Sequence, residues 1–172
     1  MSVRASQQHD RTPLMPAVLV LVILLCGWPA QAVENLLAHP GFETGTVAEA
    51  LAPFNPLFTR TPDNGAVTLD AQTAHAGARS LRIDSREEKD WGLSQKTPIP
   101  VQAADWYAIS AWVRASQVTD VGISVATRDA GGAVVNWFFS EVKATARDQW
   151  QELTRRFIVP DGVATIQFRI TG

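Results

Sequence analysis

The chain of 172 residues contains a single cysteine and three histidines, and neither sign of charge is in large excess. Cys26 has no partner, so an internal disulfide is excluded and a folded domain must be held by a hydrophobic core or a metal. The net charge of -2 gives no indication of a basic surface that would bind nucleic acid or anionic lipid. The composition therefore favours a protein that is neither disulfide-stapled nor built to bind a polyanionic nucleic acid.

Sequence patterns that carry catalysis are also missing. The chain has no Gly-x-Ser-x-Gly elbow, no His-Glu-x-x-His motif and no glycine-rich phosphate loop. Glu87, Glu88 and Asp90 form an acidic cluster, but nothing in the sequence fixes the separation that two glycosidase carboxylates need. His75 is expected to shape a turn, because no partner that would make it a catalytic base is evident. We therefore expect no catalysis in this chain, and any catalytic activity would lie in a domain beyond residue 172.

The longest apolar run lies near the N-terminus, at residues 17–28, after two arginines and before Pro-Ala-Gln-Ala at residues 29–32. This order is typical of a secretory signal peptide that is cleaved after Ala32. A membrane anchor is the alternative, although a spanning helix needs roughly 20 apolar residues. We expect residues 1–32 to be the signal peptide and residues 33–172 to form one secreted or periplasmic domain, with 13 basic and 16 acidic residues.

Within that domain, apolar residues recur at every second position in most segments. Such alternation indicates strands with one buried and one solvent-facing side. No segment shows a convincing helical periodicity, and turn-forming residues separate the alternating segments. The sequence therefore predicts an all-β fold, an antiparallel β-sandwich of the jelly-roll kind. The alternating segments are residues 80–84, 106–114, 121–126, 153–159 and 164–170.

The clearest strand pair is formed by VGISVATRD and AVVNWFF, residues 121–129 and 133–139. The Ala-Gly-Gly sequence between them predicts a tight connection, because glycine adopts positive φ readily. Strict alternation in the second strand turns either Trp137 or Phe138 outward, and the sequence leaves this choice open.

Six fragments follow one another in a recognisable order: NLLAHPGFE, HAGARSLRI, WYAISAWVRA, RDAGGAVV, WQELTRRFIVP and VATIQFRI. Together they resemble the jelly-roll carbohydrate-binding modules of the family 4, 9 and 22 type, which have the galactose-binding-like fold. The resemblance covers nearly all of residues 35–172. It implies non-catalytic binding of a polysaccharide or oligosaccharide by a module attached to, or derived from, a larger polysaccharide-acting protein. The alternative is a structural or adhesion scaffold whose tryptophans are packed.

The same resemblance implies a structural calcium ion. In that family the GFE motif supplies a glutamate and the HxG loop supplies backbone oxygens, which nominates Glu43 and the backbone from Gly77 to Arg79. Family members close the sandwich with a last strand whose aspartate completes the calcium shell, and residues 1–172 do not include it. The chain is therefore either a fragment or a departure from the family pattern. If the last strand is missing, residues 163–170 or the neighbouring strand present an open edge, and we expect residues 1–172 alone to be aggregation-prone or marginally stable.

Sugar recognition needs flat aromatic platforms, and five tryptophans follow residue 32. Trp91, beside polar residues on a connection, is either an exposed platform or a loop-packing residue. Trp112 is a platform if its side of the sheet is concave and is covered by a loop if that side is convex. Trp137 is the third candidate. Tyr107 and Trp150 are expected to pack, and Trp106, at the start of a strand, is either a platform or a packing residue, with packing favoured.

Sugar hydroxyls also need planar polar side chains beside the platform. Small residues on the solvent-facing side of residues 121–126, namely Gly122, Ser124 and Ala126, are expected to leave room for a ligand groove. The candidate polar partners are Gln95, Arg128, Gln167 and Arg169.

Overall fold

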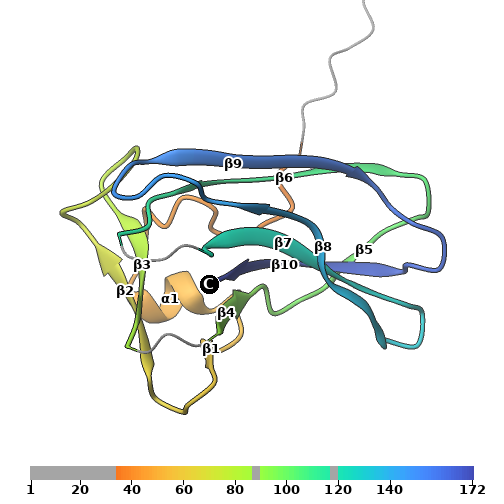
Figure 1. Ribbon diagram of the computed structural model, residues 1–172, viewed down its shortest axis with the longest axis horizontal. Helices are drawn as coiled ribbons and strands as arrows, with labels where there is room; N and C mark the ends of the chain where they lie inside the picture. Colours follow the sequence, from red (N-terminus) through yellow and green to blue (C-terminus); the bar gives the residue numbers. More distant parts are fainter. Residues whose placement is uncertain (1–33, 87–89, 117–119) are drawn as a thin grey trace, which may run out of the picture. The chain divides into compact units, whose positions relative to one another are not determined.

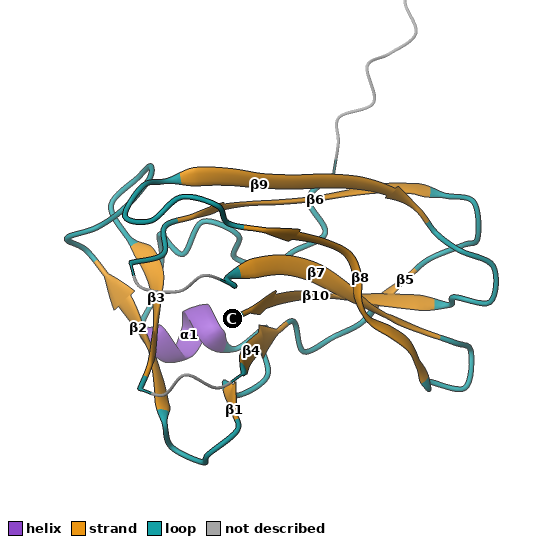
Figure 2. Ribbon diagram, viewed as in Figure 1, coloured by secondary structure: helices purple, strands orange, loops and turns teal. Residues whose placement is uncertain are grey.

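The alternating segments form β-strands in the computed structural model, which describes residues 34–86, 90–116 and 120–172. The predicted signal peptide, residues 1–32, and the acidic pair Glu87–Glu88 lie outside these ranges. Figure 2 shows mostly strands and loops. The described residues contain one short helix. The elements are α1 (Val47–Leu51), β1 (Phe58–Thr59), β2 (Gly65–Asp70), β3 (Ser80–Ser85), β4 (Trp91–Ser94), β5 (Ile99–Pro100), β6 (Trp106–Val113), β7 (Gly122–Arg128), β8 (Val134–Lys143), β9 (Gln151–Ile158) and β10 (Thr165–Thr171). Among the described residues, no helix has the length and apolar character needed to span a bilayer.

The described residues of the domain, which spans Asn35–Gly172, form three antiparallel sheets. The large sheet has the order β1-β4-β10-β7-β8, and β5 also pairs with β10. β6 pairs with β9, and β2 pairs with β3. Figure 1 shows β6 and β9 side by side in one layer and β7, β8 and β10 in another. The predicted antiparallel β-sandwich is therefore confirmed, as is the hairpin of β7 and β8.

The hydrophobic core lies between the large sheet and the β6–β9 sheet, on the sides that the alternation predicted. Burying an aliphatic or aromatic side chain of this size contributes about 1.5–3 kcal/mol, so such a core can hold the domain without a disulfide. Its buried members are Ile109, Ile123, Val125, Leu153, Phe157, Val159, Val163, Ile166 and Phe168.

β10 lies inside the large sheet, because it pairs with β4 and β5 on one side and with β7 on the other. The expectation of an open edge at residues 163–170 is therefore wrong for β10. Gly172 extends the pairing with β4, since its backbone N–H and C=O both bond to Trp91, with N···O distances of 3.3 and 2.9 Å. In the described part of the chain, β3 and β6 are among the edge strands, because each pairs with a single neighbouring strand.

The helix α1 was not predicted. Its N-terminus is a capping box: the Thr46 hydroxyl accepts a hydrogen bond from the Glu49 backbone N–H at 3.3 Å, and the Glu49 carboxylate accepts one from the Thr46 N–H at 2.6 Å. The Thr-x-x-Glu spacing was the available signal, but a five-residue helix is too short to show helical periodicity.

Candidate functional site

Two arginines and two aromatic residues meet on the outer side of the large sheet, the side turned away from the core. Arg128 ends β7, Arg169 lies in β10, and Trp137 and Phe138 are neighbours in β8. We call these four residues the arginine–tryptophan surface. Three of them were predicted to bind ligand, and the structure brings those three together.

A β-bulge explains why two consecutive aromatic residues both reach solvent. Register shifts between β7 and β8 place Trp137 and Phe138 together opposite one residue of β7, Ala126. The side chain of Asn136 stabilises the bulge by accepting a hydrogen bond from the Phe138 N–H at 2.8 Å. Trp137 is 49% exposed and Phe138 is 52% exposed. The prediction that only one of the two faces outward was therefore wrong, because it assumed strict alternation.

The guanidinium groups lie against the aromatic rings. The Cζ of Arg169 lies 5.1 Å from the ring centroid of Trp137 and 5.1 Å from that of Phe138, and the Cζ of Arg128 lies 5.5 Å from that of Trp137. These distances fall within the range of cation–π attraction. Backbone carbonyls complete the anchoring: Arg169 donates to Trp137 O at 2.8 Å and Arg128 donates to Gly132 O at 3.1 Å.

The guanidinium groups of Arg128 and Arg169 give this surface a local positive charge, although the whole chain has a net charge of -2. Among the described residues, no carboxylate lies within ion-pair distance of Arg128 or Arg169. Partial burial lowers the pKa of Arg169, and the neighbouring charge of Arg128 lowers it further. Arg169 still carries its charge at neutral pH, because a guanidinium is effectively always protonated in proteins.

Trp91 is not part of this surface, so its assignment as a ligand platform was wrong. It begins β4 rather than lying on a connection, and it is 7% exposed on the core side of that strand. It packs in a second buried cluster with Ala115 and Val121. The alternative considered from the sequence, that Trp91 packs, is the one the structure supports.

Gln95 and Gln167 are also misassigned as ligand contacts, because they are 7% and 6% exposed. The Gln167 side-chain amide donates to the Gln95 backbone carbonyl, which also accepts from the Asn55 amide at 3.3 Å. These bonds fix the segment that follows α1 to the large sheet. Ser124 and Ala126 are fully buried as well, so the predicted solvent-facing groove floor is covered.

Trp112 lies apart from the arginine–tryptophan surface, on the outer side of the β6–β9 sheet. Its ring stacks on His75, with centroids 3.7 Å apart and an interplanar angle of 10°, and His75 also contacts Trp150 edge-on at 5.7 Å. Trp112 is nevertheless 47% exposed, so His75 covers one side of its ring and leaves the rest of the side chain in solvent. Trp106 is 68% exposed on the same side, so packing, the favoured alternative for this residue, was wrong.

The candidate calcium ligands lie where two segments meet before β3. The Glu43 carboxylate accepts a hydrogen bond from Ala78 N–H at 2.9 Å, and the Arg79 guanidinium donates to Gly45 O at 2.9 Å. Gly77 has φ +72°, and a Cβ there would collide with the Glu43 carboxylate. The contact between Glu43 and the backbone at residues 77–78 therefore requires glycine at position 77. Calcium takes six to eight oxygens, and the described residues contain no group of three or more His, Cys, Asp and Glu side chains that could hold a metal. These residues alone do not complete a calcium shell, and the calcium site stays a prediction.

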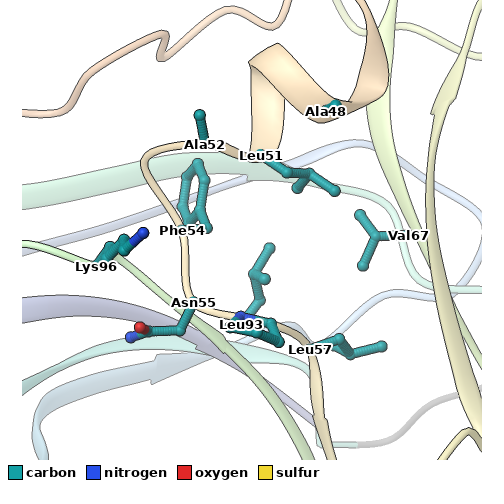
Figure 3. Close-up of a pocket in the computed structure, with 10 residues that line it drawn as sticks. Ala48, Leu51, Ala52, Phe54, Asn55, Leu57, Val67, Leu93 and Lys96 are labelled. Carbon is teal, nitrogen blue, oxygen red and sulfur yellow. The ribbon is translucent and has the colours of Figure 1, made fainter.

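A cavity of about 310 Å³ lies elsewhere, between α1, β2 and β4. Figure 3 shows aliphatic side chains around it, including Leu51, Val67 and Leu93, with Asn55 at its margin. The Asn55 amide already bonds to Ser94 Oγ at 3.0 Å. This cavity therefore lacks the exposed ring and the free planar polar groups that a sugar needs.

Comparison with solved structures supports the fold. Residues of this chain align with a structure of the enzymatically active domain of bacteriophage CBA120 tailspike protein 4 at 14% identity and a TM-score of 0.61, covering 80% of this chain and 19% of that one. The N-terminal CBM22-1–CBM22-2 tandem domain of Paenibacillus barcinonensis Xyn10C aligns at 21% identity and a TM-score of 0.58, covering 83% and 45%. The CBM22-1 xylan-binding domain of the same protein aligns at 18% identity and a TM-score of 0.53, covering 76% and 86%.

Identities this low show the fold alone. No curated protein matches the chain. The family model described as "Carbohydrate binding domain", however, matches residues 34–172, the whole of the described domain. The resemblance seen in the six sequence fragments is thereby confirmed, and the chain belongs to this carbohydrate-binding family.

Proposed function

We propose that the domain binds a polysaccharide on the arginine–tryptophan surface without transforming it. Family membership supports carbohydrate binding. The observation that supports this location is the half-exposed ring of Trp137, which lies beside two guanidinium groups that have no carboxylate partner among the described residues.

The chemistry of the four side chains suits a sugar. The C–H side of a pyranose ring stacks on the flat ring of Trp137, and Phe138 extends the apolar area. Each guanidinium has five N–H donors, and Arg128 and Arg169 each use one of their terminal nitrogens in a hydrogen bond to a backbone carbonyl. The remaining donors are available to ring and hydroxyl oxygens. Affinity should be modest, because sugar hydroxyls exchange water for protein with little net gain.

The scaffold alternative predicted packed tryptophans, and the structure divides them. Trp91 is buried, whereas Trp112 and Trp137 are 47% and 49% exposed, with one side of the Trp112 ring stacked on His75. We place the sugar on Trp137 rather than on Trp112, because two guanidinium groups lie beside the Trp137 ring whereas His75 already stacks on the Trp112 ring. Export of the module and its attachment to a polysaccharide-acting protein are further parts of this proposal, supported by the N-terminal sequence pattern and the family.

Affinity electrophoresis of residues 33–172 tests this function. Native gels would contain xylan, β-glucan, mannan, galactan or no polymer, with Trp137→Ala and Trp106→Ala run beside the wild type. We expect at least one polymer to retard the wild type and Trp106→Ala, and to retard Trp137→Ala much less. Trp106 is the matched control because it is more exposed than Trp137 but lies on the other sheet. Uniform mobility of folded protein in every gel would contradict the proposal.

A further inference from the structure

Three cationic side chains of the described residues form ion pairs with carboxylates, and the two arginines of the surface do not. Arg60 pairs with Asp90 at 2.7 Å, Arg82 with Asp84 at 2.9 Å, and Lys143 with Asp120 at 3.2 Å. No such partner lies near Arg128 or Arg169 in the described part of the chain.

These two unpaired charges also lie close to each other, since both guanidiniums contact the same Trp137 ring. Like charges at short range disfavour each other, and partial burial removes water that would otherwise solvate Arg169. The pKa of Arg169 is lowered for both of these reasons. A bound anion would relieve both costs at once.

The shape of the donor set indicates which anion. A guanidinium is a planar fork whose parallel N–H groups match the two oxygens of a carboxylate. The forks of Arg128 and Arg169 lie beside two exposed aromatic rings, so a carboxylate would be held next to a stacked ring system. A sugar ring that carries a carboxylate satisfies both features.

We propose that the arginine–tryptophan surface selects polysaccharides that contain uronic acid residues over neutral polysaccharides. The inference rests on the proposed function: Trp137 and Phe138 hold the sugar ring, and Arg128 and Arg169 hold the carboxylate. Binding therefore depends on the charge of the polymer as well as on its backbone.

The test compares each polymer with its own uncharged form. Glucuronoxylan and polygalacturonate would be used as prepared and after chemical reduction of their carboxyl groups to alcohols, so that the backbone stays the same. We expect wild-type retardation constants to fall by about tenfold or more on reduction, because charge-assisted hydrogen bonds are roughly twice as strong as neutral ones. Added salt should weaken binding to the native polymers and leave binding to the reduced ones nearly unchanged.

Substitutions of the arginines test which side chains cause the preference for the charged polymer. Arg128→Gln and Arg169→Gln should lose most of the preference for the native polymer while they still bind the reduced form. Arg156→Gln is the matched control, since Arg156 is exposed on the outer side of the β6–β9 sheet, and it should keep the preference. Circular dichroism would confirm that each variant folds, and the comparison of polymers in the wild type needs no variant at all.

The outcomes separate this inference from the proposed function. Equal wild-type binding to native and reduced polymers would overturn the inference and leave sugar binding intact. Equally strong binding to dextran sulfate would also overturn it, because the surface would then be a general anion site. Failure of the folded protein to bind any polymer, charged or neutral, would overturn the proposed function itself.

Discussion

Replacing Trp91 with alanine would remove a side chain that is 7% exposed and packed in a buried cluster. A buried tryptophan covers about 150–250 Å², which at about 25 cal/mol per Å² corresponds to roughly 4–6 kcal/mol of transfer free energy. Measured losses for Trp→Ala in protein cores are about 3–5 kcal/mol. We therefore expect Trp91→Ala to lower the free energy of unfolding by about 4 kcal/mol.

The assay is thermal and urea unfolding followed by circular dichroism, with Trp137→Ala measured in parallel. A loss of about 4 kcal/mol lowers the melting temperature of a domain this size by roughly 12 °C. Trp137→Ala should cost far less, because half of that side chain is already in solvent. Polymer binding should show the reverse order. If Trp91→Ala melts close to the wild type and loses polymer binding, then the placement of Trp91 in the core is wrong.

Three further predictions concern the loops and the helix. Glu43→Gln should lower the free energy of unfolding by about 1–2 kcal/mol, because the charged acceptor for Ala78 N–H is lost. Thermal unfolding in calcium chloride and in EDTA tests the metal prediction. A melting temperature of the wild type that rises with calcium, and does not rise in Glu43→Gln, would establish the site. Equal melting temperatures in the two solutions would mean that Glu43 only forms its hydrogen bond to Ala78 N–H. Hydrogen bonds from Thr46 lower the pKa of Glu49 below its ordinary 4.5, so the stabilisation from Glu49 should be present above that pH and lost as pH falls through the folded-state pKa. A melting temperature that falls as steeply below pH 4.5 in Glu49→Gln as in the wild type would contradict this account.

The inner side of the sandwich was predictable because it depends on local alternation. The apolar positions of β6, β9 and β10 face the core as expected, and so does the hairpin partner β7. Alternation also placed Arg169 and Gln167 on the side of β10 opposite Phe168. A period of two fixes which side a residue takes, and the structure agrees at these positions.

What covers each outer side was not predictable from local pattern. Gln167 points outward from its strand but is sealed by Gln95 and Asn55, which lie more than 70 residues earlier in the chain. Trp112 is stacked under His75, 37 residues earlier. Such coverage depends on the path of distant loops, and a single sequence contains no periodic signal for it.

The aromatic surface itself depends on an irregularity. Strict alternation would have turned one of Trp137 and Phe138 inward, whereas the bulge in β8 exposes both beside Arg169. The Asn-x-Phe sequence that stabilises this bulge carries a weak signal at most, since asparagine accepts local backbone hydrogen bonds in many turns.

The most direct test is a proton–nitrogen correlation spectrum of the tryptophan indole groups during titration with an oligosaccharide from the polymer that retards the protein. Trp137→Ala, Trp106→Ala and Trp112→Ala assign the three exposed indoles. The account predicts that the Trp137 signal shifts with saturation and that the signals of Trp91, Trp106 and Trp112 stay in place. A saturating shift of Trp106 or Trp112 with Trp137 unchanged would place the ligand on the β6–β9 sheet and contradict the account.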